Sequence, residues 1–479
     1  MVTRLQTGTL KPRILLDLPH TVHPTPTCFS TANKDLNWRQ AMSTEFCALQ
    51  AQGTWSLVPL PSDQQVIGCK WIYKLKHHAD GTIARYKARL VAQGFKQAYG
   101  IDYFETFSPD VKHTTNWLFL LVALHYDWSI HQLDVLKIQT SHIMCASCAK
   151  PSIYGIKQAP RLWFATLSNY LLAQQFTVSS ADPSFFYLHQ NGILVYILVY
   201  VDDILVNGSD QHYISSLIEK LAQRFQTRTL GSLSKFLGTE FYRTTDGYHL
   251  TQKSYITELL HAASMSNCKP LQTPLPSKYP TDPNLHLTLS AYFDSDWAGD
   301  HLDRKSTTGY CLLLGAALLA WSIKKQTTVA RSSTEAEYRS MATAATDIIW
   351  TRRLCEDFLL PQQPTVLFCN NVSAMSIACN PIFHAQTKHI EIDHHFICDC
   401  IQANHIAVHH VSTVDQLADI FTKLLSSARM LELRNKLQVV PPFSLRYGVK
   451  TTMSTTPLTL CSSPEIQKLS PRHSAPLIA

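Results

Sequence analysis

The alternation of apolar and polar positions predicts two successive regions of mixed helices and strands. In the first half of the chain, segments with a helical period alternate with short runs of β-branched and aromatic residues that are typical of strands. The predicted helices there cover residues 38–49, 116–126, 162–174 and 214–225, and the predicted strands cover residues 66–76, 82–93, 130–135, 193–200 and 204–206. The first two strands form a hairpin with Asp80-Gly81 as its turn.

The pattern restarts near residue 287 with a second set of elements. Its predicted strands cover residues 289–293, 309–319, 327–330, 366–369 and 406–411, and its predicted helices cover residues 334–358, 374–378 and 415–425. Ser332, Ser333 and Thr334 are candidates for the cap of the long helix. Three strands, a long helix and then alternating strands and helices indicate a mixed domain, so the chain falls in the α+β or α/β class.

The two ends of the chain show little periodicity. Pro, Thr and Ser recur in residues 1–35, which predicts a flexible arm, and residues 450–479 are rich in the same types, which predicts disorder. The expected segments are therefore 1–35, 36–270, 271–288, 289–430 and 431–479.

Composition and charge restrict the class of protein only a little. The chain has 42 Lys and Arg against 35 Asp and Glu, a net charge of +7, and a mild basic excess fits a nucleic-acid partner. The odd count of 13 cysteines argues against a complete disulfide framework, and the Cys and His residues at 389–400 match no zinc-finger spacing. Because no apolar run is long enough for a membrane span and no signal core is present, we expect no membrane association and a cytoplasmic location, with the nucleus as the alternative.

Two adjacent carboxylates stand between two apolar strands in the tetrapeptide Tyr200-Val201-Asp202-Asp203. Neighbouring carboxylates repel each other, and a cation such as Mg²⁺ relieves that cost through oxygen ligands. Asp134, near the end of another apolar strand, is the candidate third carboxylate of a two-metal site for phosphoryl transfer. In such a site one metal activates a primer 3′-hydroxyl and the other holds a triphosphate. A polar hairpin turn is the alternative interpretation of the bare tetrapeptide.

Over about residues 3–449 the sequence resembles the pol region of copia-type LTR retrotransposons. The matching motifs of the first half are Trp38-Arg39-Gln40-Ala41-Met42, Gly68–Lys74, Arg85–Phe95, Gln132-Leu133-Asp134-Val135, Tyr154–Arg161, Tyr200-Val201-Asp202-Asp203, Leu230-Gly231, Phe236-Leu237-Gly238 and Cys268-Lys269-Pro270. Those of the second half are Asp294–Asp300, Ser332–Tyr338, Lys388–Glu391 and Asp415–Asp419.

The resemblance implies reverse transcriptase fingers and palm over residues 36–270, followed by an RNase H-like domain over residues 289–430. It also implies Mg²⁺ as cofactor, with Mn²⁺ as an alternative, and an RNA template, a DNA primer, an RNA–DNA hybrid and dNTPs as partners. Lys87 and Arg89 resemble the fingers cations that meet the triphosphate, which suits their chemistry. The alternative is a solvated basic hairpin.

Other candidate site residues come from the same resemblance. Gln158 and Arg161 match a palm motif that contacts template and nucleotide, although a helix N-terminus with an early Pro160 is an alternative interpretation. In the second half, Asp294, Glu337 and Asp419 are the expected metal-binding and catalytic acids, preferred over Asp296, Glu335 and Asp415. Converging carboxylates that bind two Mg²⁺ ions would cut a phosphodiester with water.

The sequence departs from the family in three places. Cys369-Asn370-Asn371 stands where the family has Cys-Asp-Asn, so a neutral amide replaces the third acid. The palm has an internal deletion around residues 136–153, and residues 271–288 are a truncated connection, so the thumb is largely missing. We therefore expect a degenerate copy that is largely inactive. The alternatives are a non-catalytic nucleic-acid binder, an active polymerase with a dead RNase H, and a fragment that never folds stably.

Overall fold

The computed structural model describes residues 25–51, 67–77, 83–135, 155–225, 227–244, 247–263, 265, 278–280, 287–380 and 390–437. All of them fall within one compact unit, Met1–Val440. The predicted hairpin turn at Asp80-Gly81, the deletion around 136–153 and the disordered tail lie outside the described residues, as do most of the predicted arm and of segment 271–288. No described helix combines the length and the apolar character that a membrane crossing requires.

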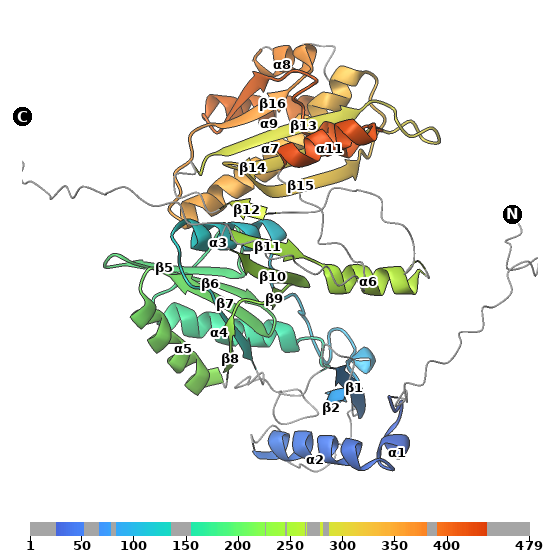
Figure 1. Cartoon of the computed structure of the whole chain (residues 1–479), viewed down its shortest axis with the longest axis vertical. Helices are drawn as coiled ribbons and strands as arrows, with labels where there is room; N and C mark the ends of the chain where they lie inside the picture. The colour runs from blue at the N-terminus through green and yellow to red at the C-terminus, as the bar shows by residue number, and fades with distance from the viewer. Residues whose placement is uncertain are drawn as a thin grey trace, which may run out of the picture. The chain divides into compact units, whose positions relative to one another are not determined.

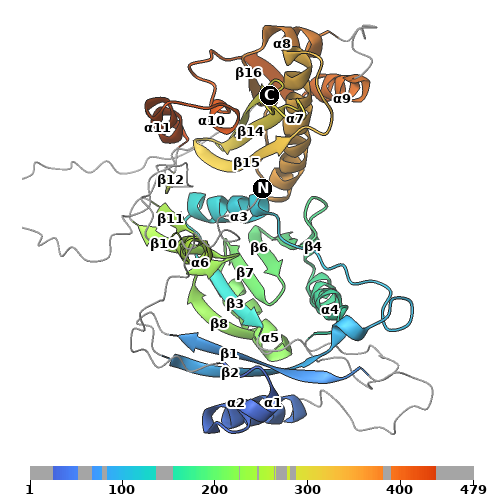
Figure 2. The same ribbon diagram turned by 90° about the vertical axis from the view of Figure 1, so that its right-hand side faces the viewer.

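The N-terminal part is a two-stranded antiparallel sheet that packs on a helix. Helix α2 (Leu36–Ala51) lies along strands β1 (Cys69–His77) and β2 (Ile83–Ala92), as Figure 2 shows. Trp38 of α2 meets the rings of Tyr73 and Tyr86 edge-on, at 5.3 and 4.9 Å between ring centroids. A short helix, α1 (Phe29–Ala32), lies inside the predicted flexible arm, and Ala32 is fully buried in the same small core. The arm prediction is therefore wrong for these residues, because the apolar contact with Trp38 and its neighbours was invisible in a local Pro- and Thr-rich pattern.

The central part is a six-stranded sheet in the order β4-β5-β6-β7-β3-β8. Its strands are β3 (His131–Val135), β4 (Thr177–Val178), β5 (Phe185–Gln190), β6 (Ile193–Tyr200), β7 (Asp203–Gly208) and β8 (Thr227–Ser232), and its helices are α3 (His113–His125), α4 (Ala159–Ala173) and α5 (Gln211–Phe225). Alternate residues of β6 point to opposite faces: Val195 and Ile197 pack with α4 and α5, whereas Tyr196 and Leu198 pack with α3. Figure 1 shows α3 on one side of this sheet and α4 and α5 on the other.

A second, smaller sheet follows, in the order β12-β11-β10-β9. Its strands are β9 (Lys235–Phe236), β10 (Thr239–Thr244), β11 (Gly247–Thr251) and β12 (Lys278–Pro280), with helix α6 (Lys253–Ala262) after β11. The 3₁₀ turn η1 (Gly94–Lys96) follows the N-terminal hairpin. None of these elements was predicted from the periodicity.

The C-terminal part is a five-stranded sheet in the order β15-β14-β13-β16-β17. Its strands are β13 (Leu289–Asp296), β14 (Thr307–Leu314), β15 (Ala317–Lys325), β16 (Thr365–Cys369) and β17 (Ile406–His410), and its helices are α7 (Ser333–Asp357), α8 (Val372–Ala378), α9 (Glu391–Gln402), α10 (Asp419–Thr422) and α11 (Ser427–Lys436). Strands β13, β14 and β15 are antiparallel, whereas β16 and β17 are parallel to β13. This arrangement confirms the fold class expected for a reverse transcriptase palm followed by an RNase H-like domain.

Three element predictions in this part are wrong in detail. The predicted strand 309–319 is two strands joined by a tight hairpin, where Gly315 takes a left-handed φ of 59° that ends β14. Residues 327–330 do not form a strand. The predicted helix 415–425 is reduced to α10, because the side chain of Asp415 accepts hydrogen bonds from Ser412 and Lys436 and holds a turn instead.

The central and C-terminal sheets share one hydrophobic core. Phe358, just after α7, stacks on Phe185 of β5 at 4.4 Å and lies 4.8 Å from the ring of Tyr196, between ring centroids. Tyr196 Oη donates to the carbonyl of Phe358 at 3.2 Å. Two polar contacts flank the rings: Trp350 Nε1 donates to Ala181 O at 2.8 Å, and Ser179 Oγ donates to a carboxylate oxygen of Asp357 at 2.6 Å.

Candidate active sites

The strand register of the central sheet brings three carboxylates together. Strands β6 and β7 form a hairpin in which Tyr200 pairs with Asp203, so that Asp202 lies in the turn. Strand β3 runs antiparallel to β7 with Asp134 directly opposite Asp203. Val135 N donates to the carbonyl of Asp202 at 2.8 Å, which holds the turn against the end of β3. The three predicted acids Asp134, Asp202 and Asp203 therefore share one edge of the sheet.

The turn that carries the two adjacent acids has an unusual backbone conformation. Val201 has a φ of 48°, which is costly for a β-branched residue and marks a position fixed by its surroundings. Trp163 of α4, which is almost completely buried, donates from Nε1 to the carbonyl of Val201 at 2.7 Å. Helix α4 thus anchors the turn from beneath.

Burial and repulsion between neighbouring carboxylates raise the pKa values of Asp202 and Asp203. Burial, followed by the nearby Asp134, raises the pKa of Asp203 to about 6, although a hydrogen bond from Gln132 works against the shift. Burial also raises the pKa of Asp202, and the positive charge of Arg89 opposes that shift. Asp202 Oδ1 is buried and has no hydrogen-bond partner among the described residues. An orphaned buried oxygen among repelling carboxylates fits a bound cation.

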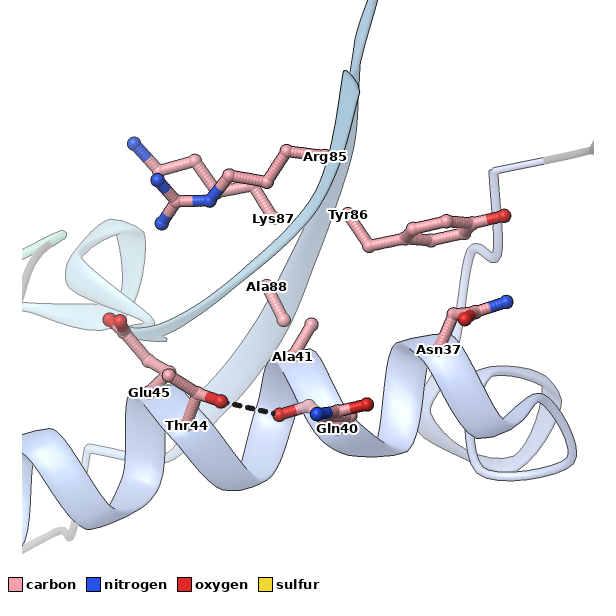
Figure 3. A pocket seen from close by; sticks show the side chains of 9 residues that line it. All are labelled: Asn37, Gln40, Ala41, Thr44, Glu45, Arg85, Tyr86, Lys87 and Ala88. Atoms are coloured by element: carbon pink, nitrogen blue, oxygen red, sulfur yellow. Dashed lines mark hydrogen bonds between the residues drawn. The ribbon is translucent and has the colours of Figure 1, made fainter. Parts of the chain in front are cut away.

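The N-terminal hairpin turns a basic face toward these acids. Direct pairs of β1 and β2 share a face, and the pairing of Lys74 with Lys87 and of Ile72 with Arg89 puts these side chains opposite the face that packs on α2. Arg89 and Lys87 both lower the pKa of Asp202, so their charges lie near it. In Figure 3, Arg85 and Lys87 extend side by side while Ala88 meets Ala41 of α2.

A hollow of about 270 Å³ lies between α2 and β2, and Figure 3 shows the side chains that line it. It is lined by Asn37, Gln40, Ala41, Thr44, Glu45, Arg85, Tyr86, Lys87 and Ala88. None of the three carboxylates lines it, so this hollow is separate from the acid cluster.

The predicted contact residues Gln158 and Arg161 are engaged within the protein. Gln158 occupies the N-cap position of α4 without a side-chain capping bond and is buried; its Oε1 accepts from Gln97 Nε2 at 3.0 Å and its Nε2 donates to Asp102 O at 3.3 Å. Arg161 forms an exposed ion pair with Glu105. The helix N-terminus with an early Pro160 is therefore present, and a contact of Gln158 or Arg161 with nucleotide or template stays a prediction.

The second acid cluster lies in the C-terminal sheet. Asp294 on β13, Glu337 on α7 and Asp419 on α10 are all buried, and Asp294 and Asp419 both influence the pKa of Glu337. Ser340 Oγ donates to Asp294 O at 2.9 Å, and Gln416 Nε2 donates to Phe293 O at 2.9 Å. These two bonds fix β13 to α7 and to the segment that leads into α10.

The three acids that the sequence placed second have structural partners. Asp296 accepts the backbone N–H of Thr307, and Asp415 pairs with Lys436 at 3.0 Å. Glu335 accepts the Arg331 N–H at 2.8 Å, and its own N–H donates to Ser332 Oγ at 3.1 Å, so that Ser332 caps α7 and Glu335 binds the residue before the cap. The metal-binding role of Asp294, Glu337 and Asp419 stays a prediction, but only these three converge.

Burial, together with the neighbouring Asp294, raises the pKa of Glu337 to about 8. Glu337 Oε2 is buried without a hydrogen-bond partner among the described residues, which suits a cation ligand. Even so, no group of three or more His, Cys, Asp or Glu side chains in the described ranges is arranged to hold a metal ion.

An amide stands where the sequence comparison with the family places its third acid. Strand β16 runs parallel to β13 with Phe368 opposite Tyr292, so Asn370 stands two residues beyond this pair, as Asp294 does. The thiol of Cys369, next to Asn370, has a pKa raised to about 12 by burial, with further contributions from Glu337 and Asp294. Asn370 is thus the direct neighbour of Cys369, which lies near Glu337 and Asp294.

Sequence reasoning missed two residues of this cluster. Lys423 Nζ lies 3.1 Å from Asp294 Oδ1 and 2.5 Å from Asp419 Oδ1, and Thr422 Oγ1 donates to Asp294 Oδ2. The spacing of Asp419 and Lys423, four residues apart, could have suggested that one pair. The contact with Asp294, 129 residues away, had no local pattern.

A glycine lets α10 approach the first strand of this sheet. Gly309 of β14 pairs with Asp294, and a Cβ there would lie 2.7 Å from Phe421 Cβ and 2.7 Å from Thr422 Cγ2. We expect Gly309→Ala to push α10 away from Asp294 and to lower the free energy of unfolding by about 1–3 kcal/mol. Urea unfolding followed by circular dichroism measures the change.

Gly68→Ala is the matched control for this substitution. A Cβ at Gly68 would lie 3.5 Å from its nearest neighbour, the side chain of Gln93, which is an ordinary contact. A Gly309→Ala protein that is as stable as the Gly68→Ala protein would contradict the tight packing of α10 against β14.

Comparisons with known proteins bear on both clusters. The family model described as "Reverse transcriptase (RNA-dependent DNA polymerase)" matches residues 52–142 and 137–277. The "Retrovirus-related Pol polyprotein from transposon RE1" of Arabidopsis thaliana is 36% identical over 539 residues, covering 92% of this chain and 37% of that protein. An uncharacterized mitochondrial protein of Arabidopsis thaliana is 39% identical over 171 residues, covering 30% of this chain and 99% of that protein.

Among solved structures, the "foamy viral protease-reverse transcriptase in complex with dsDNA" is similar at a TM-score of 0.42 and 14% identity, covering 79% of this chain and 84% of that one. This chain spans just over a third of the length of the RE1 polyprotein.

Proposed function

Because this chain belongs to the family of copia-type retrotransposon Pol polyproteins, we propose that it is a reverse transcriptase with an RNase H-like domain whose catalytic output is strongly reduced. The observation that carries the polymerase assignment is the register that sets Asp134 opposite Asp203, with Asp202 in the adjoining turn. The partners would be an RNA template, a DNA primer and dNTPs.

Each part of the first cluster has a chemical role in this proposal. Asp134, Asp202 and Asp203 would hold Mg²⁺ or Mn²⁺ through their carboxylate oxygens. A bound divalent cation supplies the positive charge that activates a primer 3′-hydroxyl and stabilises the triphosphate. Lys87 and Arg89 would neutralise the phosphates from the opposite side, since their charges already act on Asp202. Trp163 and the backbone of Val135 keep the turn of the two acids in place.

Reduced activity is proposed from what the chain lacks. The family match comes in two stretches that meet at residues 137–142, next to the strand that carries Asp134. The 539 residues aligned with the RE1 polyprotein exceed the 479 of this chain, as expected if segments are missing here. Because misplacing reacting groups by about 1 Å costs about 10²-fold in rate, incomplete support for primer and template should reduce extension strongly.

The test is RNA-templated primer extension by the purified chain with Mg²⁺ or Mn²⁺, next to an Asp202→Asn control. Binding of labelled primer–template is measured on the same samples at two salt concentrations. We expect binding that weakens steeply with salt, because the basic hairpin face contacts phosphates, and extension near the detection limit. Processive extension that Asp202→Asn abolishes would contradict the reduced output and support an active polymerase.

A second candidate function is a nucleic-acid binder without catalysis. The basic face of β1 and β2 favours it, since Lys70, Lys74, Lys87 and Arg89 need no metal to contact phosphates. Salt-dependent binding with no extension in either metal would support this candidate. Absence of binding would contradict both functions.

A further inference from the structure

The C-terminal acid cluster contains its own cation. The ammonium of Lys423 contacts one oxygen of Asp294 at 3.1 Å and one of Asp419 at 2.5 Å. The side chains of Asp294 and Asp419 are 1% and 5% exposed, whereas that of Lys423 is 38% exposed. Buried carboxylates need a partner of opposite charge, and here the chain itself provides one.

The remaining polar atoms of the cluster complete this arrangement. Thr422 Oγ1 donates to the second oxygen of Asp294, so both oxygens of this carboxylate have protein donors. The ammonium of Lys423 therefore occupies one oxygen of each buried aspartate, and a divalent cation would have to displace it from both.

The neutral side chain of Asn370 also keeps the negative charge of the cluster low. A carboxylate there would add a negative charge to a cluster whose two aspartates the single ammonium of Lys423 already offsets only in part. The neutral amide at the end of β16 removes that charge. The amide at position 370 and the ammonium of Lys423 thus act in the same direction, because both keep the negative charge of the cluster low.

We propose that Lys423 is a built-in counter-cation that bridges Asp294 and Asp419 where a divalent metal would otherwise bridge them, so that the cluster is stable without metal and binds metal weakly. This inference rests on the proposed function of the cluster as an RNase H-like metal site. A metal must break both contacts of the ammonium and then tolerate its charge nearby. The partly exposed lysine can leave toward water on its flexible stem, whereas the buried aspartates cannot move out.

The experiment measures Mn²⁺ binding by electron paramagnetic resonance in the full chain. Every sample carries Asp202→Asn and Asp203→Asn, so that the first cluster contributes little. We expect Lys423→Met to bind Mn²⁺ about 10- to 100-fold more tightly than the chain with Lys423, a range typical of residues that adjust a metal site. In chelator the Lys423→Met chain should melt at a lower temperature, and Mn²⁺ should restore the loss.

Matched variants make the result specific. Lys436→Met removes another lysine of the same domain that pairs with an acid, Asp415, at 3.0 Å, and it should leave Mn²⁺ affinity unchanged. If Lys423→Met does not fold, Lys423→Gln replaces it, because the amide is neutral but still donates a hydrogen bond to one carboxylate. Unchanged Mn²⁺ affinity in the folded Lys423 variant would overturn the inference.

An Asn370→Asp variant separates this inference from the function on which it rests. If Asn370→Asp gains Mn²⁺ affinity and the Lys423 variants do not, the cluster is a metal site and the role of Lys423 is wrong. If none of the variants binds Mn²⁺ at this cluster, the RNase H-like assignment fails and the inference fails with it.

Discussion

Replacing Phe358 with alanine is expected to lower the free energy of unfolding by about 3–5 kcal/mol, the range for truncating a buried phenylalanine. The ring is 1% exposed and lies against Phe185 and Tyr196 of the central sheet. Phe358 directly follows α7, which packs on the C-terminal sheet. Loss of its ring therefore removes contacts on which both sheets depend. We therefore expect the variant to weaken the central sheet as well as the domain that contains the substitution.

Urea unfolding with two probes tests this expectation. Tryptophan fluorescence and far-ultraviolet circular dichroism should give one coincident transition for the unchanged chain and two separated transitions for Phe358→Ala. Leu359→Ala is the control, because that neighbouring side chain is 52% exposed and should cost little. A Phe358→Ala chain that still unfolds in one transition, with stability like that of the control, would show that the two sheets do not share a cooperative core.

Restoring an acid at position 370 should raise the cleavage of an RNA–DNA hybrid by about 10- to 100-fold, the usual scale for changes around a metal centre. The unchanged chain is expected to cleave little, because Asn370 offers one neutral oxygen where a bridging carboxylate would bind metal. Asn370→Asp adds that charge at the end of β16, beside Asp294 and Glu337. Release of a fluorescent RNA fragment from a labelled hybrid measures the rate.

Asn371→Asp is a close control for the position of the new charge. Asn371 caps α8, and its side-chain oxygen accepts the Ala374 N–H at 2.9 Å. Aspartate caps a helix as well as asparagine does, so this variant adds the same charge one residue away and keeps the fold. Equal gains in Asn370→Asp and Asn371→Asp would mean that the effect comes from general charge and not from a metal ligand.

Much of the architecture follows from local pattern. The long helix α7 and its Ser332 cap, the apolar strands on either side of Asp202 and Asp203, and the hairpin of β1 and β2 all have strong periodicity, and each formed where it was expected. Strands β8 to β12 were missed because they are short and polar, and their pairing is decided by neighbours far along the chain. The turn at Gly315 in the C-terminal sheet was also missed. A single glycine inside a long apolar run did not indicate that the run divides into two strands.

The candidate sites show the same limit. The acids of the first cluster were found because strand ends and paired carboxylates are visible in sequence, although their metal-binding role stays untested. Lys423 was missed because its contact with Asp294 depends on how α10 packs across Gly309. Gln158 was expected to contact template or nucleotide. In the structure its side-chain amide bonds to Gln97 and Asp102, which lie too far along the chain for a linear motif to indicate them.

Helix α4 has a mechanical consequence for the first cluster. Its N-terminus is tied through Gln158 to Gln97, directly after the segment that ends the basic hairpin, and its Trp163 is tied to the turn of Asp202 and Asp203. Because the helix is held at Gln158 and at Trp163, a displacement at one of these contacts is transmitted to the other. Any rearrangement of the hairpin on a nucleic acid would therefore reach the carboxylates as a shift in their position, so substitutions at Gln97 could change metal affinity from outside the cluster.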